Sequence, residues 1–90
     1  MKKTERERFA LCPYFASLLY DLRTTESQSQ EKFAEILNLS IRSYSNEERG
    51  HSLCSTTTLL RVLDRMEDPR PVIRRCVELL DAAKLIDPNS

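Results

Sequence analysis

Three cysteines and a single histidine are the most reactive side chains in this 90-residue sequence. Cys12, Cys54 and Cys76 are too widely spaced to form a Cys-x-x-Cys pair, and His51 has no second ligand at the spacing of a zinc site. Isolated cysteines in odd number are typical of buried or half-buried thiols in a reducing compartment. We therefore expect neither a disulfide framework nor a bound metal, and no feature supports a redox switch.

The motifs of the common enzyme classes are also absent from the sequence. It contains no glycine-rich phosphate-binding loop and no nucleophile elbow of the Gly-x-Ser-x-Gly type. One histidine among scattered carboxylates does not make a catalytic set. We expect no enzymatic activity and no cofactor.

Composition narrows the class of protein further. The 14 basic residues are balanced by 14 acidic ones, which counts against a strong nonspecific nucleic-acid binder but allows a specific binder with a local basic face. A chain of this length forms one domain. One glycine and no alternation of apolar and polar residues favour an all-α fold. With no apolar run of about 20 residues and no signal peptide, we expect a cytoplasmic protein without membrane contact.

The segment 29–50 has the pattern of two short helices joined by a tight turn. Ser29 and Ser40 are each suited to cap the N-terminus of a helix, because a serine hydroxyl accepts a hydrogen bond from a free backbone N–H of the first turn. Asn38 tolerates the left-handed conformation that ends a helix. Gly50 is the only glycine, which predicts a positive φ angle there. This segment is the best candidate for a functional element.

Amphipathic helices are predicted on both sides of this segment. Pro13 is suited to the first turn of a helix, and apolar residues follow with helical spacing at Phe15, Leu18, Leu19 and Leu22. A later helix, capped by Ser55 or Thr56, carries Leu59, Val62, Leu63 and Met66. The last helix, about 71–86, carries the stripe Ile73, Cys76, Val77 and Leu80, which can close the core and also meet a second subunit. Residues 1–11 are highly charged and predict either a helical turn from Thr4 or a mobile arm, which would reach DNA or be a frayed terminus.

The segment 29–50 resembles the helix-turn-helix core of the lambda-repressor/Cro-like (Xre) family. The family pattern is Gln-x-x-aliphatic-Ala, a turn, and a recognition helix closing in Glu-Arg-Gly. The matching residues are Gln30, Phe33-Ala34, Leu37, Leu39-Ser40, Ser45 and Glu48-Arg49-Gly50, with Leu22-Arg23 at the expected distance before them. Where the family commonly has a glycine and an aliphatic residue, this chain has Ser27 and Gln28. The resemblance implies a lambda-repressor-like bundle of about five helices within one domain, 1–90, with the helix-turn-helix at about 29–49.

The resemblance also implies a function, namely sequence-specific binding of double-stranded DNA by a small bacterial or phage-type transcriptional regulator. In this family the recognition helix lies in the major groove. The positions that match base-facing or backbone-facing residues of the family are Gln30, Ser40, Ile41, Arg42, Ser43 and Asn46, and Arg49 could reach a phosphate.

Arg42 and Asn46 have the appropriate chemistry for these positions. Arginine makes paired hydrogen bonds to guanine, and asparagine makes them to adenine. Taken alone, both residues would be read as an ordinary solvated helix face. Since one short helix reads few base pairs, specificity would require two half-sites and hence a dimer, for which the helix at 72–86 is the candidate interface.

Two adjacent glutamates weaken the case for DNA binding. Glu47 takes a position that is usually apolar in the family, so we expect Arg61 or another cation to pair with it, or a rotation of the helix to leave it at the edge of the core. With Glu48, it would place negative charge near the presumed DNA face. The alternative function is therefore a protein-interaction module of the same fold, antitoxin-like or adaptor-like, or a scaffold piece without affinity for DNA.

Overall fold

The computed structural model describes residues 3–86, and this part of the chain is entirely helical apart from its connections. Five helices follow one another: α1 (Lys3–Thr25), α2 (Gln30–Ile36), α3 (Ile41–Glu48), α4 (Thr56–Asp64) and α5 (Arg70–Ile86). No strand is present in these residues. The predicted all-α bundle of about five helices is confirmed.

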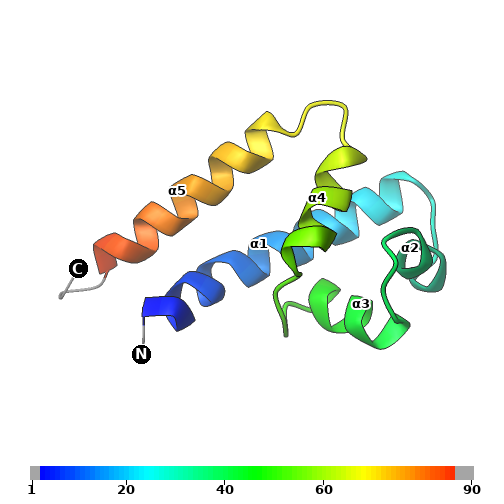
Figure 1. Cartoon of the computed structure of the whole chain (residues 1–90), viewed down its shortest axis with the longest axis horizontal. Helices are drawn as coiled ribbons and strands as arrows, with labels where there is room; N and C mark the ends of the chain where they lie inside the picture. The colour runs from blue at the N-terminus through cyan, green and yellow to red at the C-terminus, as the bar shows by residue number, and fades with distance from the viewer. Residues whose placement is uncertain (1–2, 87–90) are drawn as a thin grey trace.

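Helix α1 is the central element of the arrangement (Figure 1). It packs against α5 on one side and against α3 on the other, and α2 packs against α3. Helices α1 and α5 run antiparallel along the long axis of the molecule, which measures 43 × 28 × 19 Å. The short helices α2 and α3 gather around the C-terminal half of α1, where the core lies.

The core is built from all of α1 to α4 and centres on two aromatic rings. Phe33 and Tyr44 are fully buried and meet edge to face, with ring centroids 5.8 Å apart. The core cluster comprises Leu19, Phe33, Ala34, Leu37, Tyr44 and Val62. The burial of two large rings contributes on the order of several kcal/mol to the free energy of unfolding, so this cluster is a main source of stability.

Serine residues cap the three short helices. The hydroxyls of Ser29, Ser40 and Ser55 accept hydrogen bonds from the backbone N–H groups three residues later, at 3.1, 3.1 and 3.2 Å. Each cap satisfies a donor that a helix leaves free at its first turn, which stabilises it by roughly 1 kcal/mol. The predicted caps at Ser29 and Ser40 are confirmed, and Ser55 rather than Thr56 caps α4.

Three residues with positive φ angles lie in the connections between helices. They are Ser27 (55°), Asn38 (59°) and Gly50 (78°). The predictions for Asn38 and Gly50 are confirmed. Ser27, at the position where the resemblance leads one to expect glycine, adopts the left-handed conformation, in which a serine is strained.

Helix α1 does not begin at Pro13, as the sequence predicts. It begins at Lys3 and continues through Pro13. A proline inside a helix removes one backbone hydrogen bond and costs about 3 kcal/mol. The packing of α5 against α1 provides the tertiary contacts that offset this cost. Of the two expectations for residues 1–11, the helical one is met for residues 3–11, which belong to α1, and residues 1 and 2 lie outside the described residues.

The apolar stripe of α5 is only partly used in the core. Ala83 is buried, whereas Ile73 and Val77 are 48% and 52% exposed. Cys76 and Leu80 line an apolar groove that also includes Phe15 of α1. The stripe therefore faces α1 along one edge and solvent along the other.

Candidate nucleic-acid interface

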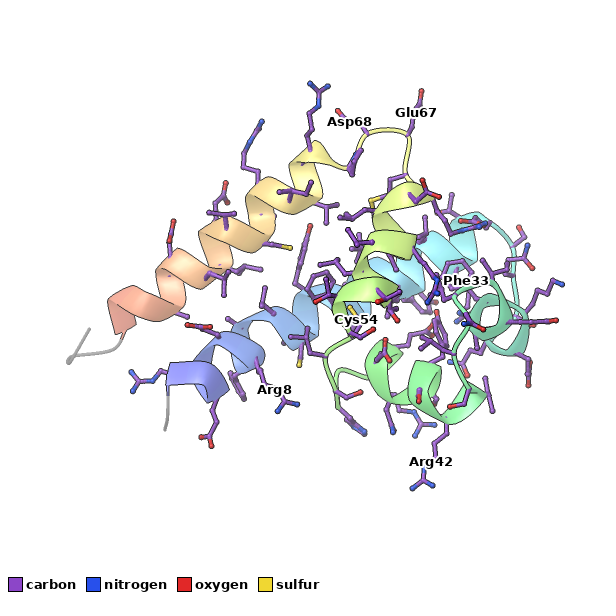
Figure 2. The ribbon with its side chains drawn as sticks, in the orientation of Figure 1. Arg8, Phe33, Arg42, Cys54, Glu67 and Asp68 are labelled. Carbon is purple, nitrogen blue, oxygen red and sulfur yellow. The ribbon has the colours of Figure 1, made fainter. Side chains whose placement is uncertain are left out.

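The helix-turn-helix predicted for residues 29–49 corresponds to α2, the turn at Asn38 and α3. Arg42, Asn46 and Arg49 are spaced i, i+4 and i+7 and so share one face of α3. Arg42 and Arg49 are exposed and Asn46 is half-buried. Figure 2 shows Arg42 pointing away from the body of the protein. Within the described part of the chain neither arginine forms an ion pair.

Ser40, Ile41 and Ser43 lie at the start of the same helix. The hydroxyl of Ser40 is occupied, since it caps α3 and donates to the hydroxyl of Ser43 at 3.0 Å. Ser43 remains exposed and has its own hydroxyl proton to donate. Ile41 is 44% exposed and offers an apolar contact surface.

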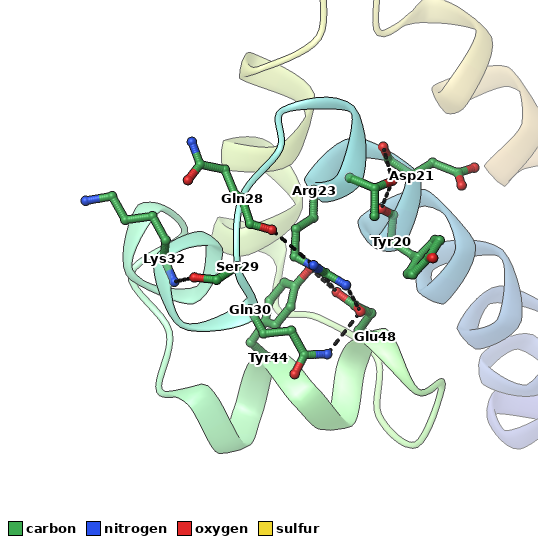
Figure 3. Close-up of polar contacts among 10 residues, drawn as sticks. Tyr20, Asp21, Arg23, Gln28, Ser29, Gln30, Lys32, Tyr44 and Glu48 are labelled. Atoms are coloured by element: carbon green, nitrogen blue, oxygen red, sulfur yellow. Dashed lines mark hydrogen bonds and ion pairs between the residues drawn. The ribbon is translucent and has the colours of Figure 1, made fainter.

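Gln30 is directed toward the protein. Its side-chain N–H₂ group donates to a carboxylate oxygen of Glu48 at 3.1 Å (Figure 3). Sequence reasoning assigned Gln30 to a phosphate and missed this bond. Its role toward DNA stays a prediction, with the amide already oriented by Glu48.

Glu48 is the centre of a polar network that joins α1, α2 and α3 (Figure 3). The guanidinium of Arg23 donates to both carboxylate oxygens at 2.9 Å, and the hydroxyl of Tyr44 donates to the same group. Arg23 also donates to the backbone carbonyl of Gln28 at 3.0 Å. A two-bond arginine–carboxylate pair is strong and directional, so it holds α3 at a defined angle to α1.

The network shifts the ionisation of its members. Burial acts to raise the pKa of Glu48, but the hydrogen bonds from Arg23, Tyr44 and Gln30 outweigh it and lower the pKa. Burial, followed by the bond to Glu48, raises the pKa of Tyr44. Glu48 is thus a fully ionised carboxylate whose charge is matched by Arg23. The sequence carries no local signal for this pairing, because Arg23 and Glu48 lie 25 residues apart.

Glu47 has the opposite environment. It is only 7% exposed, and its Oε1 atom has no hydrogen-bond partner within the described residues. Burial raises the pKa of this carboxyl. The expected pairing with Arg61 is wrong, because Arg61 donates instead to the backbone carbonyl of Leu37 at 3.4 Å. The alternative of a position at the edge of the core is also wrong, since the side chain is buried.

The charges of α3 are therefore separated between its two sides. Both carboxylates, Glu47 and Glu48, lie on the side that faces the protein, whereas both arginines, Arg42 and Arg49, are exposed. The argument that the glutamates place negative charge on the outer face does not hold in the folded protein. The exposed face of α3 carries positive charge only.

The other reactive residues do not form a site with this face. Cys12, Cys54 and Cys76 are free and half-buried, as predicted. Burial raises the pKa of Cys54 to about 11, which keeps this thiol protonated and unreactive near neutral pH. Within residues 3–86, no three histidine, cysteine or acidic side chains are grouped so that they could bind a metal ion.

Comparisons with known proteins add no relative. No family model, no curated protein and no solved structure matches this chain. None of the helices in the described residues is long and apolar enough to cross a membrane.

Proposed function

We propose that this protein binds double-stranded DNA in a sequence-specific manner and acts as a small transcriptional regulator of the Xre type. The observation that carries the proposal is the separation of charge on α3, whose exposed face carries Arg42 and Arg49 while Glu47 and Glu48 are turned inward. A basic outer face favours the entry of a helix into the major groove, which is lined by negatively charged phosphates.

Base recognition is assigned to the outer face of α3. Arg42 has a free guanidinium that can donate two parallel hydrogen bonds to O6 and N7 of guanine, and Asn46 can pair in the same way with adenine. Ile41 offers an apolar contact to a thymine methyl group. Ser43 and Arg49 lie at the two ends of this face and are suited to the flanking phosphates.

The Glu48 network supports recognition by fixing the position of α3. A side chain reads a base edge only if its backbone is held within a fraction of an ångström. Arg23 of α1 and Gln30 of α2 bind the Glu48 carboxylate of α3, so α3 cannot tilt without breaking several hydrogen bonds. Glu48 is therefore a positioning residue and not a DNA contact.

A homodimer through residues 72–86 completes the proposal. Ile73 and Val77 are exposed on successive turns of α5, and Cys76 and Leu80 lie beside them. These four residues form the apolar surface that we call the α5 strip. In a two-fold dimer the same strip packs against its own copy, so one apolar surface on each subunit is sufficient. Two copies of α3 would then face two half-sites about one helical turn apart.

The proposal is tested by selection from random duplex DNA on the purified protein, with binding measured at two salt concentrations. We expect an enriched inverted repeat and an affinity that falls steeply with salt, because bound phosphates release counterions. Arg42→Ala should lose about 1–3 kcal/mol on the selected sequence and little on random DNA. Equal weakening on both would assign Arg42 to the backbone and contradict base reading.

A protein-interaction module of the same fold is the second candidate. It is favoured by the zero net charge and by two large apolar side chains outside the α5 strip, Phe9 at 73% and Leu60 at 60% exposure. Exposed apolar patches commonly mark protein partners. This function predicts weak DNA binding even at low salt and no enriched sequence, so the same selection experiment separates the two candidates.

A further inference from the structure

We infer that Arg8, on the N-terminal half of α1, is an additional contact to the DNA backbone, and that it binds a phosphate together with His51. The inference rests on the proposed function and extends its interface beyond the helix-turn-helix. It assigns a DNA-binding role to a helical segment for which the sequence alone predicted either a helical turn or an arm.

The position of Arg8 follows from the contact between α1 and the end of α3. Gly50 lies so near α1 that a Cβ atom there would be 3.8 Å from the carbonyl oxygen of Cys12. Arg8 lies one helical turn before Cys12, and it lines one surface hollow with Gly50 and His51. The long α1 thus places Arg8 beside the residues that directly follow α3, although they are more than 40 positions apart in the sequence.

The side chain of Arg8 is available for a ligand. It is exposed, and it forms no hydrogen bond or ion pair within the described residues. Figure 2 shows it directed toward the same side of the molecule as Arg42. His51 is exposed as well. A guanidinium and an imidazole N–H on two sides of one hollow form a suitable pair of donors for a phosphate oxygen.

A phosphate suits this position better than a base. In the proposed complex the residues of α3 occupy the major groove, and Arg8 lies beyond the C-terminal end of that helix. The sugar-phosphate backbone borders the groove on both sides. A contact there orients the protein without reading the sequence.

Glu5 lines the same hollow, one turn before Arg8. Its carboxylate repels a phosphate, so it acts against Arg8. Glu5→Gln is expected to strengthen DNA binding while Arg8→Gln weakens it, and the two changes of opposite sign test the same position.

The experiment measures the affinity of Arg8→Gln for the selected sequence and for a random duplex across a range of salt. Arg70→Gln is the matched control, because it removes the same charge from an exposed position at the start of α5, outside residues 72–86 of the proposed dimer interface. We expect Arg8→Gln to weaken binding to both duplexes by the same factor. The slope of log affinity against log salt should fall by about one per protomer, while Arg70→Gln changes neither the affinity nor the slope.

A second measurement locates the contact on the DNA. The selected duplex is made with single neutral methylphosphonates in place of successive phosphates. At one position per half-site, the neutral replacement should lower the affinity of the wild-type protein. The affinity of Arg8→Gln should be the same for that duplex as for the unmodified one. Additive losses at every position would overturn the inference, as would an Arg8→Gln protein that behaves like Arg70→Gln or weakens only the selected sequence.

These outcomes are distinct from failure of the proposed function. If the wild-type protein enriches no sequence and binds weakly at low salt, the function and the Arg8 contact are both rejected. If the wild-type protein selects a sequence and Arg8→Gln is silent, only the Arg8 contact is rejected.

Discussion

The two halves of α1 lie in contrasting surroundings. Its C-terminal half meets α2 and α3, where Phe33, Leu37 and Tyr44 are fully buried and Arg23 binds Glu48. Its N-terminal half meets α5, where large apolar side chains remain exposed. The exposed side chains on that side are Phe9 of α1 and Ile73 and Val77 of α5.

The two halves of this 90-residue chain therefore differ in how they are packed. The half with α2 and α3 holds the buried cluster around Phe33 and Tyr44 and the hydrogen-bonded Glu48 network, while Tyr20 and Ile41 stay 52% and 44% exposed at its surface. The half with α5 is packed incompletely and presents apolar surface. In our proposal a second copy of the chain covers this apolar surface.

The largest expected effect is the loss of the Arg23–Glu48 pair. Arg23→Ala leaves a buried carboxylate with two hydrogen-bond donors and no cation, which should reduce the free energy of unfolding by about 3–5 kcal/mol. Arg75→Ala, which removes an exposed pair with Glu78 at 3.1 Å, should cost less than about 1 kcal/mol. Chemical denaturation of both variants measures the contrast. Similar losses would show that the two sides do not differ as described.

An effect of opposite sign is expected at Glu47. Glu47→Leu replaces a buried carboxyl that has an unpaired oxygen by an apolar side chain, and it should raise the free energy of unfolding by about 1–3 kcal/mol. Denaturation of Glu47→Leu and of the wild-type protein at neutral pH measures this gain. No gain, or a loss, would mean that the Glu47 side chain has partners in solution that the structure does not contain.

The advantage of Glu47→Leu should also depend on pH. Burial raises the pKa of Glu47 above the ordinary value of 4.5, so the folded state binds the proton more tightly than the unfolded state. The wild-type protein therefore loses stability as pH rises from about 4.5 to the folded-state pKa, and the variant gains its advantage across that window. Glu48 has a lowered pKa, so its contribution is complete above 4.5 and is lost as pH falls through the folded-state value.

A substitution in the α5 strip should have the smallest effect on the free energy of unfolding. It should have a clear effect on the oligomeric state. Val77→Asp changes a side chain that is 52% exposed, so the monomer should lose no more than about 0.5 kcal/mol. A dimer that buries this strip should dissociate, because an unpaired carboxylate would enter an apolar interface. Sedimentation velocity of the wild-type and variant proteins compares the two states. A variant that stays dimeric would place the dimer contact elsewhere on the surface.

Features set by near neighbours in the chain were predictable. The caps at Ser29 and Ser40, the left-handed Asn38 and the positive φ of Gly50 each depend on hydrogen bonds or steric limits within a few residues. These caps and backbone conformations are therefore determined by the local sequence. The bounds of α2 and α3 followed from them, and so did the positions of Arg42, Asn46 and Arg49 on one face.

The features that sequence reasoning missed depend on groups from distant parts of the chain. Nothing near Pro13 reveals that α5 packs along the N-terminal half of α1, and nothing near Gln30 reveals that its amide binds Glu48, 18 residues later. The burial of Glu47 without a bond to Arg61 also depends on distant groups, since Arg61 donates to the backbone carbonyl of Leu37, 24 residues earlier.

By itself, the sequence determined the number and type of the helices, their caps and turns, and which residues share a face of α3. Helical periodicity and capping act over one or two turns and need no tertiary contact. Only the tertiary structure decided which charges point outward. Arg23 of α1 binds Glu48 of α3, 25 residues later in the chain, and this pair holds the Glu48 carboxylate on the inner side of α3. The charged side chains left on the outer face of α3 are then basic.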